Sequence, residues 1–354
     1  MHESIEQLGE STDHQKADCG PEIQRFAKRF VMTTAFVLSG GGSLGAAQVG
    51  MLRALTAHGI HPDLVVGASV GSLNAAFYAA RPDAQGVDEL ARLWLQVGEH
   101  DVYPLEPSQM LPRLLAGFPG RPVRAVLRAL GGLNYIFPVD PFLVGRAAAG
   151  RADHVFSNRR FEGFLHRVMP LERIEDAMVP LKILATDACD GRGVLLTCGP
   201  VVPALMASTA VPGFYPPVEV EGRRLIDGAV ANGTTLDRAI ALGADEVYVL
   251  ARGFPCRLSA PPSTVLAMAI HAYNLLEEQR MAASIAQARA HVRLHVLPPV
   301  RPVELLPIDF RQTALLIEAA TDSTQQWLDH RLPDAPNVAS EVSRVLRTGR
   351  SDPS

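Results

Sequence analysis

GASVG, residues 67 to 71, places a serine between two glycines, a spacing that suits a nucleophile. The motif follows an apolar stretch at residues 64 to 68, which predicts a buried strand, and precedes an alanine-rich helical pattern. A strand that turns abruptly into a helix brings backbones close together and forces unusual dihedral angles on its middle residue. We therefore predict that Ser69 is a catalytic nucleophile at a helix N-terminus, supported by Gly67 and Gly71, with a helix-capping serine as the alternative.

A second glycine-rich segment, at residues 39 to 45, follows a predicted strand at residues 34 to 39. Its glycines match G-x-G-x-x-G, so a nucleotide-dependent oxidoreductase is a competing interpretation. A dinucleotide site needs an acidic residue at the far end of the second strand, whereas Asp63 lies at that strand's beginning. Adjacent parallel strands end at the same edge of a sheet, so this loop and Ser69 are expected to be neighbours, and the loop is predicted to be an oxyanion hole. The amides expected to form it are those of Gly40, Gly41, Gly42 and Ser43.

IDGA, residues 226 to 229, ends an apolar pattern with an aspartate and two small residues. A carboxylate with an ordinary pKa of about 3.9 is a poor base for a hydroxyl, so Asp227 must be partly desolvated to activate Ser69. A turn aspartate is the alternative, because Asp-Gly is a common turn pair. We predict that Asp227 is the catalytic base, with support from Gly228. Four later histidines could instead complete a Ser-Asp-His order: His271, His291, His295 and His330.

The order of predicted elements indicates an α/β fold. Two strand-turn-helix units between residues 34 and 80 imply a parallel sheet covered on both faces. Asp190-Gly191 and Glu221-Gly222 predict two hairpins, the second of which leads to Asp227. Further expected elements are a helix at residues 236 to 243, a strand at 245 to 252, and long helices from about Ser263 to Ala290 and from about Arg311 to His330. We predict a three-layer αβα fold with a mainly parallel central sheet.

One large domain is expected between two flexible ends. The first thirty residues are predicted to be flexible because they are polar and show no sustained apolar period. The predicted parts are a flexible segment at residues 1 to 30, a single α/β hydrolase domain at 31 to 332, and a flexible tail at 333 to 354. Within the domain, a proline-interrupted helical insertion is expected over the active-site edge at residues 98 to 150, and C-terminal helices at 263 to 330. The insertion is either ordinary surface packing or a lid. Its apolar residues that would suit an acyl channel are Leu114, Leu115, Phe118, Ile136 and Phe137.

Composition narrows the function classes. The chain has 354 residues, 47% of them hydrophobic, and a formal net charge of −4, which argues against a nucleic-acid partner. No membrane span and no secretory signal are expected, so the predicted location is cytoplasmic, and any membrane contact is expected to be peripheral. Neither a cofactor nor a metal is expected, because no metal-type Cys/His spacing occurs. Four scattered cysteines are expected to be reduced thiols: Cys19, Cys189, Cys198 and Cys256.

Four blocks occur in one order: SGGGSLG, GASVG, MASTAVPGFYPP and DGA. From about Thr33 to Leu250 this arrangement resembles the patatin-like phospholipase family. The resemblance implies a patatin-like α/β fold, a Ser69-Asp227 dyad, an oxyanion hole in the first block, and an acyl-enzyme that hydrolyses lipid esters of the phospholipase or lysophospholipase type.

The chain departs from the family pattern at two positions. Many members have Arg or Lys where this chain has Leu44, and the third motif often ends in two glycines where this chain has Ala229 after Gly228. A missing cation near the oxyanion would lower activity, so a catalytically weak lipid-binding or regulatory protein is one alternative. Transfer of the acyl group to an alcohol is another. The sequence leaves the head group, the chain length and the oligomeric state unknown.

Overall fold

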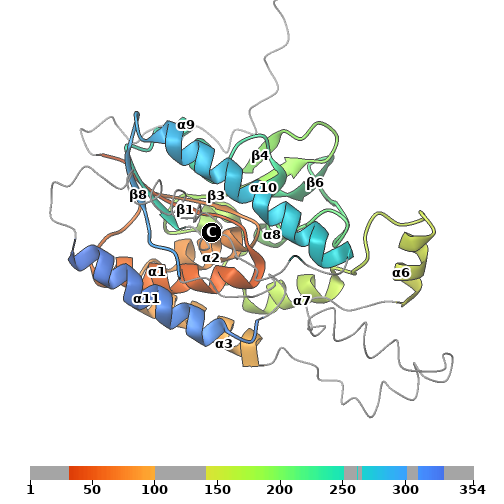
Figure 1. Cartoon of the computed structure of the whole chain (residues 1–354), viewed down its shortest axis with the longest axis horizontal. Helices are drawn as coiled ribbons and strands as arrows, with labels where there is room; N and C mark the ends of the chain where they lie inside the picture. Colours follow the sequence, from red (N-terminus) through yellow and green to blue (C-terminus); the bar gives the residue numbers. More distant parts are fainter. Residues whose placement is uncertain (1–31, 100–140, 251–260, 262–264, 301–309, 331–354) are drawn as a thin grey trace, which may run out of the picture. The chain divides into compact units, whose positions relative to one another are not determined.

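An eight-stranded sheet forms the centre of the computed structural model, which describes residues 32–99, 141–250, 261, 265–300 and 310–330 (Figure 1). The strands run in the order β5-β6-β3-β2-β1-β7-β8, and β4 pairs with β3 off this path. The parallel strands are β1 (Thr34–Leu38), β2 (Leu64–Ala68), β3 (Leu181–Asp187), β7 (Glu246–Leu250) and β8 (Arg293–Val296). The antiparallel strands are β4 (Gly193–Leu196), β5 (Val218–Val220) and β6 (Arg223–Asp227).

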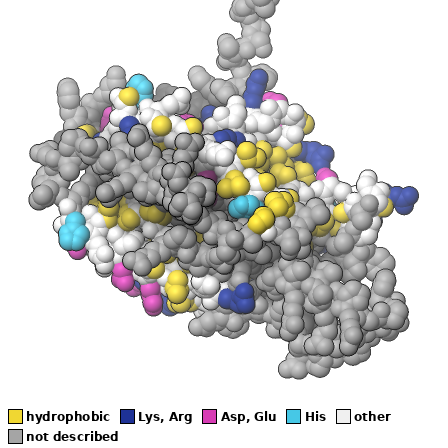
Figure 2. Space-filling view, viewed as in Figure 1, with side chains coloured by type: hydrophobic (Ala, Val, Ile, Leu, Met, Phe, Trp, Pro, Cys, Tyr) yellow, Lys and Arg dark blue, Asp and Glu magenta, His cyan; other side chains and the backbone are white. Residues whose placement is uncertain are grey.

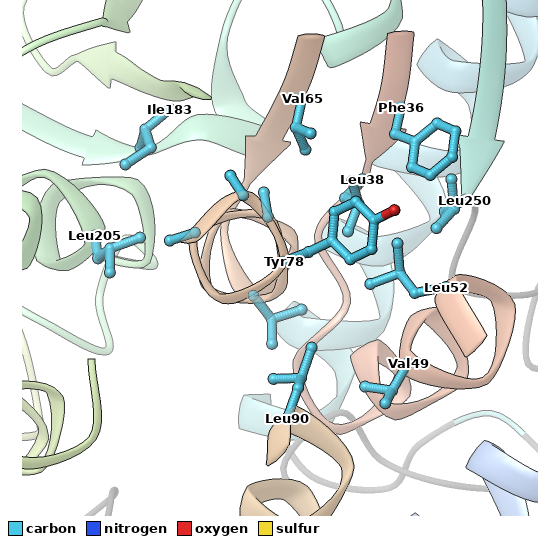
Figure 3. Close-up of a cluster of buried hydrophobic side chains, with 14 of the residues drawn as sticks. Phe36, Leu38, Val49, Leu52, Val65, Tyr78, Leu90, Ile183, Leu205 and Leu250 are labelled. Atoms are coloured by element: carbon cyan, nitrogen blue, oxygen red, sulfur yellow. The ribbon is translucent and has the colours of Figure 1, made fainter. Parts of the chain in front are cut away.

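The central strands are buried on both faces, as their continuous apolar runs predict. In β1, Phe36 and Leu38 face one core, whereas Ala35 and Val37 face the other. Figure 3 shows the first core, in which the Phe36 ring stacks on Tyr78 with centroids 5.8 Å apart. The alternation of side chains along a strand thus divides the hydrophobic residues between two helical layers.

Helices cover both faces of the sheet, so the predicted three-layer αβα arrangement is confirmed (Figure 1). One face packs against α9 (Thr235–Ala241) and α10 (Val265–Ala288). The other face packs against α1 (Ala46–Ala57), α2 (Val70–Ala80) and α8 (Val201–Ser208), with α3 (Ala84–Glu99), α7 (Arg159–Val168) and α11 (Thr313–Asp329) around them. The remaining elements are α6 (Pro141–Ala148) and the 3-10 turns η2 (Gly42–Gly45), η3 (Ile174–Asp176) and η4 (Gly228–Val230).

The packing of α1 on α11 depends on a glycine. A Cβ atom added at Gly50 would lie only 2.2 Å from the carbonyl oxygen of Ile317. The two helices therefore approach each other more closely than any larger side chain at position 50 permits.

Both predicted hairpins are confirmed, since β3 pairs with β4 and β5 pairs with β6 in antiparallel register. Three helices were not expected from the sequence: α3, α7 and α8. The helix α8 contains Pro203 in its first turn, where a missing N–H and a fixed φ are tolerated. Of the predicted insertion, residues 100–140 lie outside the described part of the chain, as do both predicted flexible ends, residues 1–30 and 333–354.

The expectation of four reduced cysteines is wrong for Cys198, which is disulfide-bonded, whereas Cys189 is free and exposed. The spacing of cysteines along the chain does not by itself show which thiols form a disulfide. The other two cysteines lie outside the described residues.

Candidate active site

Ser69 occupies a sharp turn between β2 and α2. Its backbone has φ 53° and ψ −134°, a strained conformation for a residue with a side chain. A Cβ at Gly67 would lie 2.6 Å from the carbonyl oxygen of Gly71, and one at Gly71 would lie 2.4 Å from that of Leu38. Both glycines predicted to support the turn are therefore required by close backbone contact.

Ser208, from α8, holds this turn in place. The backbone N–H of Ser69 donates to Oγ of Ser208 at 2.9 Å, and that hydroxyl donates to the carbonyl of Leu184 at 2.7 Å. The carbonyl of Ser69 accepts from the N–H and the hydroxyl of Ser72. Ser208 was not a candidate in the sequence, although it lies in the MASTAVPGFYPP block.

Asp227 lies at the end of β6, where its side chain contacts the side chain of Ser69. The hydroxyl of Ser69 donates to Oδ2 of Asp227 at 2.7 Å, and the N–H of Ala229 donates to Oδ1 at 2.8 Å. The backbone carbonyl of Asp227 accepts from the hydroxyl of Thr186 at 2.7 Å. A Cβ at Gly228 would lie 2.0 Å from a carbonyl oxygen of β3, so the chain can pass here only with a glycine.

Burial sets the acidity of this carboxyl. Asp227 is completely buried, and its pKa is raised from 3.8 to about 7, mainly by desolvation. The negative charge of Glu277 contributes to this rise, whereas the hydrogen bonds from Ala229 and Ser69 and the nearby hydroxyl of Tyr273 lower the pKa. Asp227 is thus matched to the task of a general base near neutral pH, as the sequence argument required.

The glycine loop lies beside Ser69, as predicted, because β1 and β2 are parallel neighbours with Leu38 opposite Gly67. Gly41 and Gly42 have φ of 145° and 58°, and both line a cavity together with Ser69. Among the described residues, the amides of these two glycines have no hydrogen-bond acceptor.

The other two residues of the predicted oxyanion hole differ from Gly41 and Gly42. The N–H of Gly40 donates to Oε1 of Glu277 at 3.1 Å. Ser43 is fully buried within η2, and neither it nor Leu44 lines the cavity in the described part of the chain. Of the four residues predicted for the oxyanion hole, only Gly41 and Gly42 line the described cavity.

A buried hydrogen-bond network holds both ends of the glycine loop, at Ser39 and Gly45. Gln48 donates to the carbonyls of Ser39 and Leu250, and Asn74 donates to Oε1 of Gln48 and to the carbonyl of Gly45. The indole N–H of Trp94 donates to Oδ1 of Asn74 at 2.8 Å. Polar residues inside the apolar helical runs of α1 and α2 were the sequence signal for this network.

The cavity beside Ser69 has a volume of about 260 Å³ and is mostly apolar. Its walls come from α2, α3, α7, α10 and the segment after α8. Side chains that form these walls include Leu73, Phe77, Leu90, Trp94, Phe161 and Leu165. The residues suggested for an acyl channel, between positions 114 and 137, lie outside the described part of the chain.

The described residues do not assemble either alternative site from the sequence analysis, a serine-histidine pair or a dinucleotide site. Among the described residues that line the cavity there is no histidine, and His295 instead pairs with Glu246 at 2.6 Å. Asp63 accepts a hydrogen bond from the backbone N–H of Thr34 at the opposite end of the strands, far along them from the glycine loop. Within the same described ranges, no group of His, Cys, Asp or Glu could hold a metal ion, and no helix is both long and apolar enough to span a bilayer.

Comparisons with known proteins agree with these motifs. The family model described as Patatin-like phospholipase matches residues 36–240. Patatin-like phospholipase domain-containing protein 6 of Homo sapiens is 27% identical over 249 residues, which are 70% of this chain and 15% of that protein. A lysophospholipase of Aspergillus terreus is 27% identical over 230 residues, which are 65% of this chain and 12% of that protein. The chain therefore matches only a small part of the length of these curated relatives.

Among solved structures, type III effector protein ExoU aligns with 89% of this chain and 58% of its own, at 20% identity and a TM-score of 0.34. That score is too low for any comparison of sites. The family model carries the assignment, because its span is more than half of the 354 residues and includes the serine turn, the glycine loop and Asp227. The chain belongs to the patatin-like phospholipase family.

Proposed function

We propose that this chain is a serine acyl hydrolase that cleaves carboxylic esters of lipids through a Ser69-Asp227 dyad. The observation that carries the proposal is the 2.7 Å hydrogen bond from the Ser69 hydroxyl to a buried carboxylate beside an apolar cavity. A base with a pKa of about 7 is ionised in a large fraction of molecules at neutral pH, and so it accepts the serine proton.

Acylation begins with attack of Ser69 Oγ on the ester carbonyl carbon while its proton moves to Oδ2 of Asp227. The carbonyl oxygen becomes an oxyanion that the amides of Gly41 and Gly42 stabilise, each such donor contributing about 3 kcal/mol. When the tetrahedral intermediate collapses, the bond to the leaving alkoxide breaks, and the proton on Asp227 passes to that oxygen. The products are an acyl-Ser69 ester and an alcohol.

Deacylation repeats these steps with water. Asp227 removes a proton from a water molecule, and the resulting hydroxide oxygen attacks the acyl carbon. Collapse breaks the bond to Ser69 Oγ, which regains a proton from Asp227, and a fatty acid leaves. One buried carboxylate therefore suffices for both halves of the reaction, without a histidine.

A lipid acyl chain is the substrate part that the cavity suits. Its walls are aliphatic and aromatic side chains, so burying methylene groups there is favourable by about 0.8 kcal/mol for each. The names of the related proteins, phospholipase and lysophospholipase, support the same substrate class.

Peripheral contact with a membrane surface is part of this proposal. Figure 2 shows hydrophobic side chains gathered over α10 on the face seen there. Met268 and Leu276 of this helix are 42% and 61% exposed, and Ala269 and Ile270 between them line the cavity. An exposed apolar helix face beside the cavity suits contact with a bilayer that supplies the lipid.

Labelling with a fluorophosphonate probe tests the dyad, because such probes react with activated serines. We expect the probe on the peptide that contains Ser69, no label in Ser69→Ala, and a strong decrease in Asp227→Asn. Asp190→Asn is the matched control, since it removes the same charge from an exposed hairpin and should label like the parent. A folded parent protein that takes up no probe would contradict the proposal.

A further inference from the structure

One face of α10 contacts three parts of the proposed site. Tyr273, Glu277 and Arg280 are spaced by four and three residues, so they lie on the same side of the helix. The hydroxyl of Tyr273 favours the ionised form of Asp227, and the carboxylate of Glu277 accepts the N–H of Gly40. In Figure 1, α10 crosses the molecule on the opposite side of the sheet from α1 and α2.

Arg280 ties this helix to the segment that follows Asp227. Its guanidinium donates to the backbone carbonyls of Ala229, Val230 and Ala231. The helix therefore has a fixed position relative to the dyad, and a side chain one turn earlier is held there with it.

Glu277 is that side chain, and it is buried against the glycine loop. Only 9% of its surface is exposed, and it lines the cavity that contains Ser69. A Cβ added at Gly40 would lie 3.0 Å both from Oε1 of Glu277 and from Cβ of Ser69. Gly40 thus packs against both Ser69 and the Glu277 carboxylate, with no room for a larger residue.

The hydrogen bond between Gly40 and Glu277 orients the loop. Hydrogen bonds to a charged acceptor are roughly twice as strong as neutral ones. With the first amide of the loop held at 3.1 Å by Glu277, the next two glycines turn with positive φ along the cavity. Loss of this bond would release the start of the segment that carries the proposed oxyanion donors.

We infer that Glu277 is a positioning residue for acyl transfer, which fixes the glycine loop through Gly40 and places a second negative charge beside the Ser69-Asp227 dyad. This inference rests on the proposed function. Glu277 forms no bond to the substrate in this role, and it acts through Gly40 and Asp227.

The second negative charge has a definite consequence for pH dependence. The groups that act on Asp227 are the hydroxyls of Ser69 and Tyr273, the N–H of Ala229, and the charge of Glu277, with Arg280 on the carbonyls just beyond. Of these, the Glu277 charge raises the pKa of Asp227, whereas the hydrogen bonds lower it. Removing that charge should move the acidic limb of activity to lower pH.

Two substitutions separate the hydrogen bond from the charge. Glu277→Gln keeps an oxygen that accepts the Gly40 N–H but removes the charge, whereas Glu277→Ala removes both. Glu278→Gln is the matched control, because it makes the same change at the next residue, which does not line the cavity. The measurements are kcat and KM for a short-chain nitrophenyl ester across the pH range, with fluorophosphonate labelling and thermal unfolding of each protein.

We expect Glu277→Ala to lower kcat by about tenfold or more, the scale of a lost hydrogen bond to a charged group, with little change in KM. Glu277→Gln should restore most of kcat at alkaline pH and shift the acidic limb of kcat/KM to lower pH than in the parent. Glu278→Gln should match the parent in both respects.

The outcomes distinguish this inference from the proposed function. A parent that is not labelled at Ser69 contradicts the proposed function itself. A labelled parent whose Glu277→Gln and Glu277→Ala variants keep the parental kcat and pH profile contradicts the positioning role. If Glu277→Ala does not fold, an unshifted acidic limb in folded Glu277→Gln contradicts the inference equally well.

Discussion

Replacing Asp227 with asparagine should stabilise the protein at alkaline pH although it removes the proposed base. Burial raises the pKa of Asp227 to about 7 in the folded protein, whereas the unfolded chain ionises near its ordinary value of about 3.9. Between these two values, the folded state holds a proton that the unfolded state has lost. The stability that the protonated group contributes is therefore complete below about pH 4 and is lost as pH rises through about 7.

The size of this effect follows from the difference in pKa. One unit is worth about 1.4 kcal/mol, so a rise from 3.8 to about 7 corresponds to about 4 kcal/mol of lost stability above pH 7. Asparagine is nearly isosteric with aspartate and stays neutral. Its oxygen can accept the N–H of Ala229 and its NH₂ group can donate to Ser69, so both hydrogen bonds at the site have replacements.

Urea unfolding of the parent and Asp227→Asn at about pH 5 and about pH 8.5 measures the effect. At pH 5 the parent has lost only about 1–2 kcal/mol, so the gain in Asp227→Asn should be larger at pH 8.5 by about 2–3 kcal/mol. Comparing the two pH values cancels any effect of the asparagine that does not depend on pH. Equal gains at both pH values, or a gain of the same size in Asp190→Asn, would refute the reasoning.

Three further substitutions test how the site is supported. Gly50→Ala should cost about 1–3 kcal/mol in urea unfolding because its Cβ would strike α11, whereas Gly163→Ala, a helical position with open space around it, should be neutral or stabilising. Ser208→Ala should lower kcat about tenfold with little change in KM, because the backbone amide of the proposed nucleophile, Ser69, loses its acceptor. Asn74→Leu should cost about 1–3 kcal/mol and alter the fluorescence of Trp94, whose indole N–H then lacks its buried partner; an unchanged spectrum and stability would contradict the role of this network.

Much of the fold could be predicted because its signals are local. Apolar runs at residues 34–39 and 64–68 and the Asp-Gly and Glu-Gly pairs gave strands and hairpins where the structure has them. The helix α8 was missed because it is short and contains Pro203 near its start, so composition argued for a loop. The amphipathic α3 was also missed, although its apolar face forms part of the cavity wall.

The proposed nucleophile and base could be located in the sequence because backbone geometry constrains their neighbours. At Gly67, Gly71 and Gly228 a Cβ would lie 2.6 Å or less from a backbone atom. Only glycine fits at these three positions, so the sequence itself shows where the backbone turns tightly. Ser69 and Asp227 could be singled out from those glycines before their contact was known.

The sequence by itself therefore determined most of the strands and helices and the two motifs that carry the proposed dyad. Only the tertiary structure decided which distant groups surround these motifs. Three hydrogen bonds show this, because they join residues 139 to 237 positions apart: Ser69 to Asp227, Ser69 to Ser208, and Gly40 to Glu277. The burial that raises the pKa of Asp227 to about 7 is likewise a property of the assembled core. Local spacing fixes backbone turns, whereas desolvation and long-range hydrogen bonds exist only once the layers have packed.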